Sequence, residues 1–216
     1  MTLGRRTSLF TLVLLFGGLG SAGAIGQQPR PPLPPSDEPP IEAAREALPP
    51  GENLIAPPPA GWVLAYSDRD DDRSVYEYIP ADQNPDDPRD ILAIEVLNDA
   101  KGVSPAGLLE RERRAFEQEC EGAVAEPAQD RAVSGRAGAR QFLLCGKARR
   151  GGKGQAVLRQ VVVGQEASYI VERGWRGEGF RGSALPQAVR ALVPDWHRAL
   201  DQIRLCDTRD KARPCK

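Results

Sequence analysis

The sequence predicts an α+β domain in which a mainly antiparallel sheet packs against two principal helices. Two observations predict this class. Strand-like apolar runs come in groups joined by short segments rich in turn-forming residues, which is typical of antiparallel hairpins. Two segments with helical periodicity follow these groups instead of alternating with single strands, and this order favours α+β over a parallel sheet.

The first 24 residues are predicted to be a secretory signal peptide that is removed. Arg5 and Arg6 precede an apolar run at residues 9–19, and small residues follow at 21–24. A membrane anchor needs about 20 apolar residues, and glycines interrupt this run early. We therefore expect a periplasmic or secreted protein with no stable membrane span after processing.

Residues 25–60 are predicted to be a proline-rich, disordered spacer. They hold twelve of the chain's 20 prolines, and this density favours polyproline II and prevents a packed core. Residues 61–216 are then expected to form one folded domain, whose length of about 150 residues is ordinary for a single domain.

The first strands of this domain are predicted at residues 62–66, 75–79 and 91–97. The first two lie on either side of a polar segment that is rich in turn-forming residues. This arrangement indicates a hairpin, and the third strand follows a second polar connection.

The first helix is predicted to begin at Ser104 and Pro105, which supply an N-cap and a first-turn proline. Apolar residues recur at helical spacing over about four turns up to Cys120, which would end the helix on its apolar side. Gly122 lies where a C-terminal glycine of the helix is expected.

Three long strands are predicted at residues 140–147, 155–163 and 167–175. Glycines between the first two allow a tight turn. The last helical region, residues 185–206, is predicted to break or restart at Pro194. Its apolar stripe, which should lie on the sheet, consists of Trp196, Leu200 and Ile203.

The order of these elements carries a resemblance to a known fold family. Together with the Gly61-Trp62 pair at the domain start and the aromatic strand at residues 76–80, the order resembles the Mog1/PsbP-like α/β/α sandwich over residues 61–206. The resemblance implies the fold of this domain.

The C-terminal tail carries a second resemblance. It is similar to the tail of a family of uncharacterised exported proteobacterial proteins in two motifs, Cys206-Asp207-Thr208-Arg209 and Pro214-Cys215. This resemblance implies an extracytoplasmic location and disulfides, and it implies no activity.

The four cysteines are predicted to form two disulfides, because their number is even and the expected compartment is oxidising. Cys120 should pair with Cys145, since the first helix would cover the strand that carries Cys145. Cys206 should pair with Cys215 and hold the polar tail against the domain. A four-cysteine zinc site needs closely spaced ligand pairs, which this spacing lacks.

Charge and motifs point away from several function classes. The chain has 29 basic and 30 acidic residues, a balance that gives no general attraction to nucleic acid. Asp68, Asp70 and Asp72 alternate like calcium ligands, but Arg73 and Ile79 stand where a calcium loop needs glycine and glutamate. A solvated hairpin tip explains the run better. We expect no nucleic acid partner, no metal and no cofactor.

Candidate catalytic residues are scarce. His197 is the only histidine, and no nucleophile elbow, metalloprotease helix or phosphate-binding loop accompanies it. It should face solvent, four residues before Asp201, which suits an exposed ion pair. The basic loop at residues 147–153 could attract an anionic partner or serve as a solubilising hairpin tip. It contains no aromatic residue that would stack on a base.

Trp175, Arg176 and Phe180 are the predicted ligand contacts, because they lie in or beside a glycine-rich loop at a strand end. The alternative is that the aromatic rings anchor this loop to the core. We expect a non-catalytic envelope binding or assembly module whose partner is an unknown envelope protein or an anionic envelope component. The alternative function is an envelope hydrolase with a carboxylate pair that the sequence does not identify.

Overall fold

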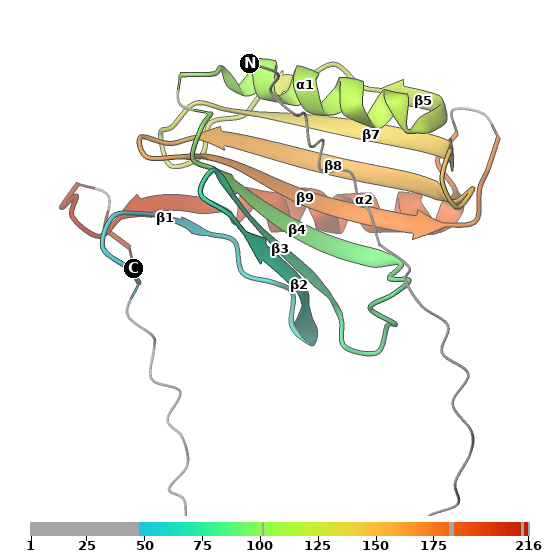
Figure 1. Ribbon diagram of the computed structural model, residues 1–216, viewed down its shortest axis with the longest axis horizontal. Coiled ribbons are helices and arrows are strands. Elements are labelled where there is room, and N and C mark those ends of the chain that lie inside the picture. Colours follow the sequence, from blue (N-terminus) through green and yellow to red (C-terminus); the bar gives the residue numbers. More distant parts are fainter. Residues whose placement is uncertain (1–47, 101, 182–183, 213, 216) are drawn as a thin grey trace, which may run out of the picture. The chain divides into compact units, whose positions relative to one another are not determined.

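The structure is a computed structural model that describes residues 48–100, 102–181, 184–212 and 214–215. The predicted signal peptide and residues 25–47 of the predicted spacer lie outside the described residues. Within those ranges, an eight-stranded antiparallel sheet carries one helix on each face, and two further strands pair separately (Figure 1). The predicted α+β class, with a large antiparallel sheet and two principal helices, is confirmed.

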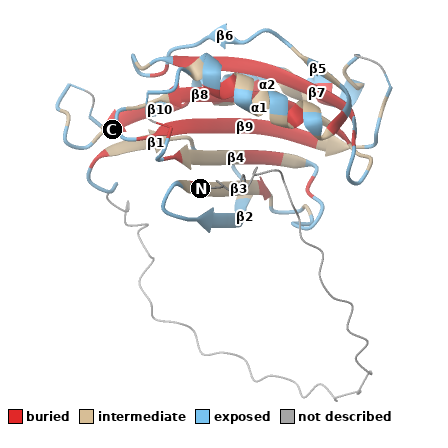
Figure 2. Cartoon of the chain, turned by 45° about the horizontal axis from the view of Figure 1, so that its top comes forward, coloured by how far each residue is buried: buried red, intermediate tan, exposed pale blue. Residues whose placement is uncertain are grey.

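The sheet begins with three strands, β2 (Trp62–Arg69), β3 (Arg73–Pro80) and β4 (Asp90–Leu97). β2 and β3 form a hairpin, and the Asp70 carboxylate closes its turn by accepting from the backbone N–H groups of Asp72 and Arg73 at 3.0 and 2.7 Å. The aspartate run is thus a hairpin tip. β2 lies at the edge of the sheet and is exposed along most of its length (Figure 2).

Helix α1 (Pro105–Gln118) begins at Ser104, whose hydroxyl accepts a hydrogen bond from the first turn at 3.1 Å. The helix ends earlier than predicted. Cys120 is the first residue of strand β5 (Cys120–Ala125), and Gly122 lies inside this strand with a φ of +77° instead of capping the helix. The backbone of β5 forms hydrogen bonds with strand β7. The stabilisation from this long-range pairing outweighs the local helical propensity of the sequence.

The centre of the sheet consists of three long strands, β7 (Gly138–Ala148), β8 (Gly154–Val163) and β9 (Ser168–Gly177), close to the positions predicted. The short β6 (Gln129–Asp130) pairs with β7. α1 packs over β7, β5 and β8 on one face, and α2 (Gln187–Asp201) packs over β8 and β9 on the other. Because both faces are covered, nearly every residue of the three strands is buried (Figure 2).

Helix α2 differs from the predicted final helix in two ways. It continues through Pro194, which is exposed, so that the missing N–H removes one hydrogen bond without breaking the helix. It also ends at Asp201, and the last predicted turn is instead strand β10 (Arg204–Asp207). The predicted apolar stripe, Trp196, Leu200 and Ile203, is buried, although Ile203 lies after the end of the helix.

Strand β1 (Glu52–Ile55) extends the folded part into the predicted spacer. It pairs antiparallel with β10 over four residue pairs. β1 thus lies before Gly61, where the domain was expected to begin. β1 was not predicted because prolines lie on both sides of it. Its hydrogen bonds come from β10, near the other end of the sequence.

The disulfides join Cys120 to Cys145 and Cys206 to Cys215, with Cα atoms 5.7 and 5.1 Å apart. This is the predicted pairing, but the first bridge links neighbouring strands β5 and β7 rather than a helix and a strand. Two disulfides are compatible with an extracytoplasmic protein. Among the described residues, no helix combines the length and the apolar character that crossing a bilayer requires.

Candidate functional site

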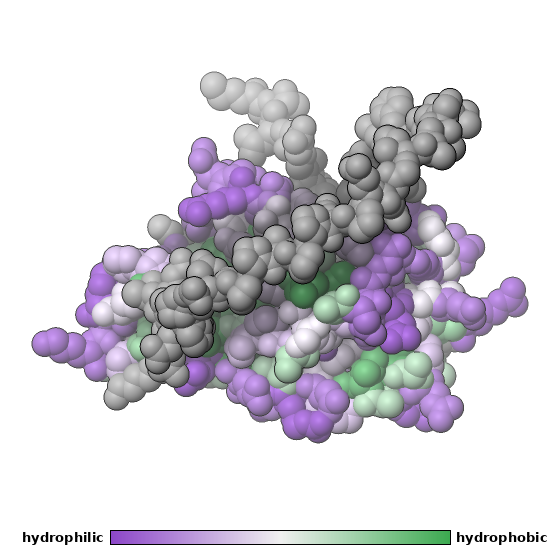
Figure 3. Space-filling view, turned by 90° about the horizontal axis from the view of Figure 1, so that it is seen from below, coloured by the Kyte–Doolittle hydropathy of each residue, from purple (hydrophilic) through white to green (hydrophobic). Residues whose placement is uncertain are grey.

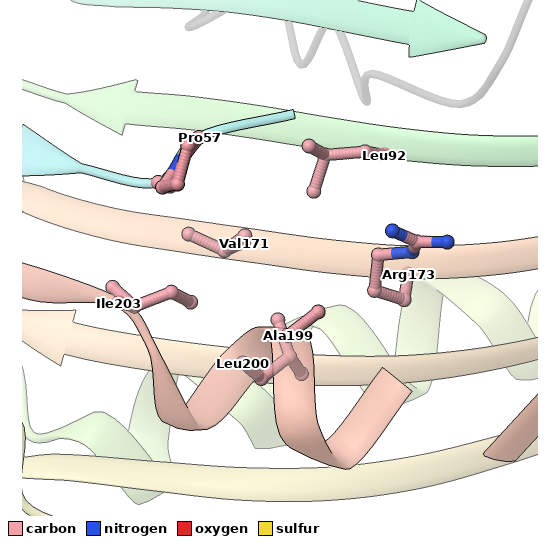
Figure 4. A pocket seen from close by; sticks show the side chains of 8 residues that line it. Pro57, Leu92, Val171, Arg173, Ala199, Leu200 and Ile203 are labelled. Atoms are coloured by element: carbon pink, nitrogen blue, oxygen red, sulfur yellow. The ribbon is translucent and has the colours of Figure 1, made fainter. Parts of the chain in front are cut away.

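A small pocket lies between α2, β9, β4 and the segment that follows β1 (Figure 4). We call it the α2 pocket. Its apolar walls include Pro57, Leu92, Val171, Leu200 and Ile203, and Arg173 of β9 is its charged lining residue. The volume of about 10 Å³ leaves room for roughly one water molecule. The pocket therefore admits no more than one or two atoms of a ligand, and the rest of a ligand would lie outside it.

The alternation of β9 places Arg173 on the α2 face of the sheet. Val171 and Trp175 point to the same face, whereas Glu172 points to the α1 face. Arg173 is 8% exposed, and its Cζ atom lies 4.4 Å from the centroid of the Trp62 ring. A cation–π contact of this kind contributes about 0.5–2 kcal/mol.

Arg173 has no carboxylate partner among the described residues, and its Nε is buried there without a hydrogen bond. Burial lowers the pKa of Arg173, while the more distant carboxylates of Asp90 and Asp195 act in the opposite direction. The guanidinium still stays charged, because the pKa of arginine is far above neutral. A buried charge without a partner is costly, so the arrangement favours the arrival of an anion.

Within the described ranges, two other arginines are equally buried, and both have partners. Arg140, also on the α2 face, is 7% exposed, donates to Gln160 Oε1 at 2.9 Å and lies 2.9 Å from the Asp201 carboxylate. Arg159, on the α1 face, is 9% exposed and lies 2.5 Å from the Glu172 carboxylate. The pocket arginine is the exception to this pattern.

An apolar row leads from the pocket arginine to the edge of the sheet. Arg173 lies opposite Leu92, Leu92 opposite Tyr78, and Tyr78 opposite Leu64, with one residue from each neighbouring strand. Leu64 is 51% exposed. Figure 3, which views the molecule from the β2 side, shows hydrophobic patches within a mostly hydrophilic surface. The arrangement suits a ligand that joins an anionic group to an apolar body.

The structure separates the three predicted ligand contacts. Trp175 and Arg176 are consecutive in β9 and therefore point to opposite faces. Trp175 is buried in the α2-face core, and Phe180 packs against that core while its backbone N–H donates to the Gly146 carbonyl at 2.8 Å. Arg176 lies among the charges of the α1 face. Both aromatic rings fit the role of loop anchors, and contact of the three residues with a ligand stays a prediction.

Sequence reasoning missed Arg173 and its aromatic neighbour Trp62. One signal was present, since Glu172 and Arg173 interrupt a largely apolar strand, and charged residues are rarely buried unless they are paired. The pairing itself is not visible in the sequence. Glu172 meets Arg159 on one face, whereas Arg173 meets an aromatic ring on the other.

His197 and the basic loop take part in contacts that differ from those expected. His197 is exposed, but its Nδ1 lies 3.2 Å from Arg140 Nη1, and Asp201 contacts Arg140 and Arg131 instead of the histidine. Both lysines of the basic loop form ion pairs with carboxylates of neighbouring segments. These contacts hold the loop against the domain.

The α1 face carries a cluster of charged residues on β3, β4, β8 and β9. Arg73 contacts Glu95, and Arg159 contacts Glu172. Burial raises the pKa values of Glu77 and Glu95. Raised carboxylate pKa values occur in catalytic sites and also in structural ion-pair networks.

No protein-family model matches this sequence, and no curated protein matches it at a significant level. Similar solved structures include LpqN, involved in cell envelope biogenesis of Mycobacterium tuberculosis, with 16% identity and a TM-score of 0.44 over 74% of this chain and 87% of LpqN. They also include the Ran-binding protein Mog1 of Saccharomyces cerevisiae, with 9% identity and a TM-score of 0.41 over 69% of this chain and 84% of Mog1. A Pseudomonas aeruginosa protein of unknown function has 15% identity and a TM-score of 0.43, over 62% of this chain and 83% of that protein. These likenesses concern the path of the chain alone.

Proposed function

We propose that this chain is an exported, non-catalytic binding module that holds the anionic group of an envelope component in the α2 pocket. Arg173 supplies the positive charge, and the outer part of the row, the half-buried Tyr78 and the exposed Leu64, accommodates the apolar body of the ligand. The observation that carries the proposal is a buried guanidinium without a carboxylate partner among the described residues.

The geometry around Arg173 supports recognition of a carboxylate or phosphate. Guanidinium groups bind these anions through parallel N–H donors in the plane of the group. The Trp62 ring occupies the space over the guanidinium, so an anion would approach along the edge.

The proposed location and the absence of catalysis have separate supports. The location rests on the signal-peptide pattern and on the two disulfides. Binding is favoured over a carboxylate-based hydrolase because Glu95 and Glu172, which lie near Glu77 on the α1 face, each contact an arginine. A carboxylate engaged in this way is poorly placed to activate water.

The variant Arg173→Met tests the proposal, with octanoate as the probe and octan-1-ol as its uncharged counterpart. We expect the wild-type protein to bind octanoate more tightly than octan-1-ol in isothermal titration calorimetry. The variant should lose about tenfold or more in octanoate affinity, because a charge-assisted hydrogen bond is removed, and should bind octan-1-ol unchanged.

Arg69→Met, at the exposed hairpin tip, is the matched control and should bind octanoate like the wild type. Arg173→Met should not lower the free energy of unfolding, because it removes a buried charge that has no carboxylate partner in the described part of the chain. Equal octanoate affinity in the wild type and in Arg173→Met contradicts the proposal. So does a variant that loses binding only together with its folded structure.

A further inference from the structure

The two edges of the eight-stranded sheet differ in how they are protected. β5, at one end, is short, irregular at Gly122 and joined to its neighbour by a disulfide. β2, at the other end, has eight residues and pairs with β3 on one side (Figure 2). Among the described residues, no strand pairs with its outer side, which we call the β2 edge. An open strand edge can accept a further strand from another chain.

The backbone of the β2 edge presents a short, regular row of hydrogen-bonding groups. The Asp70 N–H donates to the Arg73 carbonyl at 2.8 Å and closes the hairpin. Because hydrogen-bonded and non-hydrogen-bonded pairs alternate in an antiparallel ladder, the N–H and C=O groups of Ser67 and Arg69 then point away from β3. A bulge at Ala65 interrupts the register, which limits a partner strand to a short stretch and opposes open-ended pairing.

Apolar side chains gather beside this row. Of the six large apolar residues that are exposed in the described part of the chain, three lie on β2: Val63, Leu64 and Tyr66, each about half exposed. Val63 lies opposite Ile79 and Tyr66 opposite Glu77, so both belong to the α1 face of the sheet. Helix α1 packs over β7, β5 and β8 and leaves these two side chains uncovered. The side chains of an added strand would remove them from water.

Negative charge lies at both ends of the β2 edge. Residues 61–100, which contain β2, β3 and β4, include eleven Asp and Glu residues but three arginines and no lysine. Asp71 and Asp72 are exposed at the hairpin tip, beyond the last residue of β2. Asp82 is exposed near the first residue of β2, because the end of β3 lies opposite that residue. An apolar centre between acidic ends favours a partner with basic residues at both ends.

The same charges argue against a second copy of this chain as the occupant. If two β2 edges pair antiparallel, the hairpin tip of one copy lies beside the start of β2 in the other. If they pair parallel, the two tips lie side by side. Both arrangements bring carboxylates together without a compensating base, which is unfavourable. The charge pattern therefore favours a different polypeptide.

We propose that the β2 edge binds an extended segment of a partner protein by strand addition, and that this segment has apolar residues at alternate positions and Lys or Arg at both ends. Its backbone forms hydrogen bonds with Ser67 and Arg69, and its apolar side chains contact Val63 and Tyr66. The backbone bonds supply affinity, and the side chains and charges supply specificity. This surface is separate from the α2 pocket and does not depend on an anion at Arg173.

The probe is a capped nonapeptide of alternating valine and threonine between two pairs of lysines. One control peptide has glutamates in place of the lysines. A second control keeps the lysines but is N-methylated at the amides of its central residues, so that it cannot extend the sheet. We expect the lysine peptide to bind at least about tenfold more tightly than either control in isothermal titration calorimetry. Its advantage over the glutamate peptide should shrink at high salt.

The variant Ser67→Pro removes one outward N–H, and proline is tolerated in an edge strand where the N–H faces solvent. We expect an affinity for the lysine peptide about tenfold lower than in the wild type. Ser67→Ala keeps this N–H and is the matched control, which should bind the peptide like the wild type. Circular dichroism should show the same folded structure in both variants. Octanoate binding, whatever its strength in the wild type, should not change in either variant.

A second variant keeps the proposal testable if Ser67→Pro fails to fold. Asp71→Asn combined with Asp72→Asn removes two exposed charges from the hairpin tip and should weaken binding of the lysine peptide about threefold. No binding of this peptide to the wild type, or equal binding of the N-methylated peptide, would overturn the proposal. So would a wild-type dimer that Ser67→Pro converts to a monomer in light scattering, because the β2 edge would then be an interface between copies.

Discussion

Glu172 and Arg173 are neighbours in β9, yet their charged groups have different surroundings on the two faces of the sheet. On the α1 face, Glu172 lies 2.5 Å from Arg159. On the α2 face, Arg173 lies against an aromatic ring and has no carboxylate partner among the described residues. Arg140, on the same α2 face, is fully engaged, so the difference does not come from the face itself. Pairing, and not burial, separates the arginines that maintain the structure from the one that we assign to binding.

The largest expected effect is at the paired site on the α1 face. Arg159→Met leaves the Glu172 carboxylate buried without its partner and should lower the free energy of unfolding by about 3–5 kcal/mol. Urea unfolding followed by circular dichroism measures this loss. The double variant Arg159→Met, Glu172→Met should recover most of it. A loss no larger than that of Arg173→Met would remove the distinction between the two faces.

A smaller effect is expected at the paired arginine of the α2 face. Arg140→Met leaves the fully buried Gln160 Oε1 without its donor, whereas Asp201 is exposed enough to be hydrated. We expect a loss of about 1–3 kcal/mol in the same unfolding experiment. Octanoate affinity should not change. A variant as stable as the wild type would show that Arg140, like Arg173, gains little from its surroundings.

The smallest expected effect concerns Glu77 and depends on pH. Burial raises its folded-state pKa above the ordinary value of 4.5, so the folded protein binds this proton more tightly than the unfolded chain does. The stability from this proton is present below the ordinary pKa and is lost as the pH rises through the folded pKa. Glu77→Gln should therefore raise the melting temperature at pH 7, and the gain should shrink near pH ~4. A gain that is independent of pH would point to a cause other than ionisation.

The elements that local pattern defines could be predicted from the sequence, and the short strands could not. The three central strands and α1 carry their own periodicity and caps, so their places are visible locally. β1 and β10 have four residues each, and each exists because the other lies beside it, about 150 positions away. Cys120 shows the same limit. Its disulfide partner was predicted, but its strand depends on pairing with β7.

The candidate site was less visible in the sequence than the fold. Trp175 and Phe180 stood out because they are aromatic residues beside glycines, yet packing in the core accounts for their positions. Among the residues that the structure describes, Arg173 is distinguished by the lack of a carboxylate beside it, and that depends on where the carboxylates of distant strands point. The sequence contains nearly equal numbers of acids and bases, so composition alone cannot show which arginine lacks a partner.

The three tryptophans of the chain all belong to the α2 face. Trp175 and Trp196 are buried in the core, whereas Trp62 is half-buried and stacks on the Arg173 guanidinium. An anion that forms hydrogen bonds with this guanidinium changes the electric field at the Trp62 indole. The surroundings of the other two indoles stay the same. The protein thus contains its own optical reporter for the α2 pocket, which can be read from intrinsic fluorescence without any label.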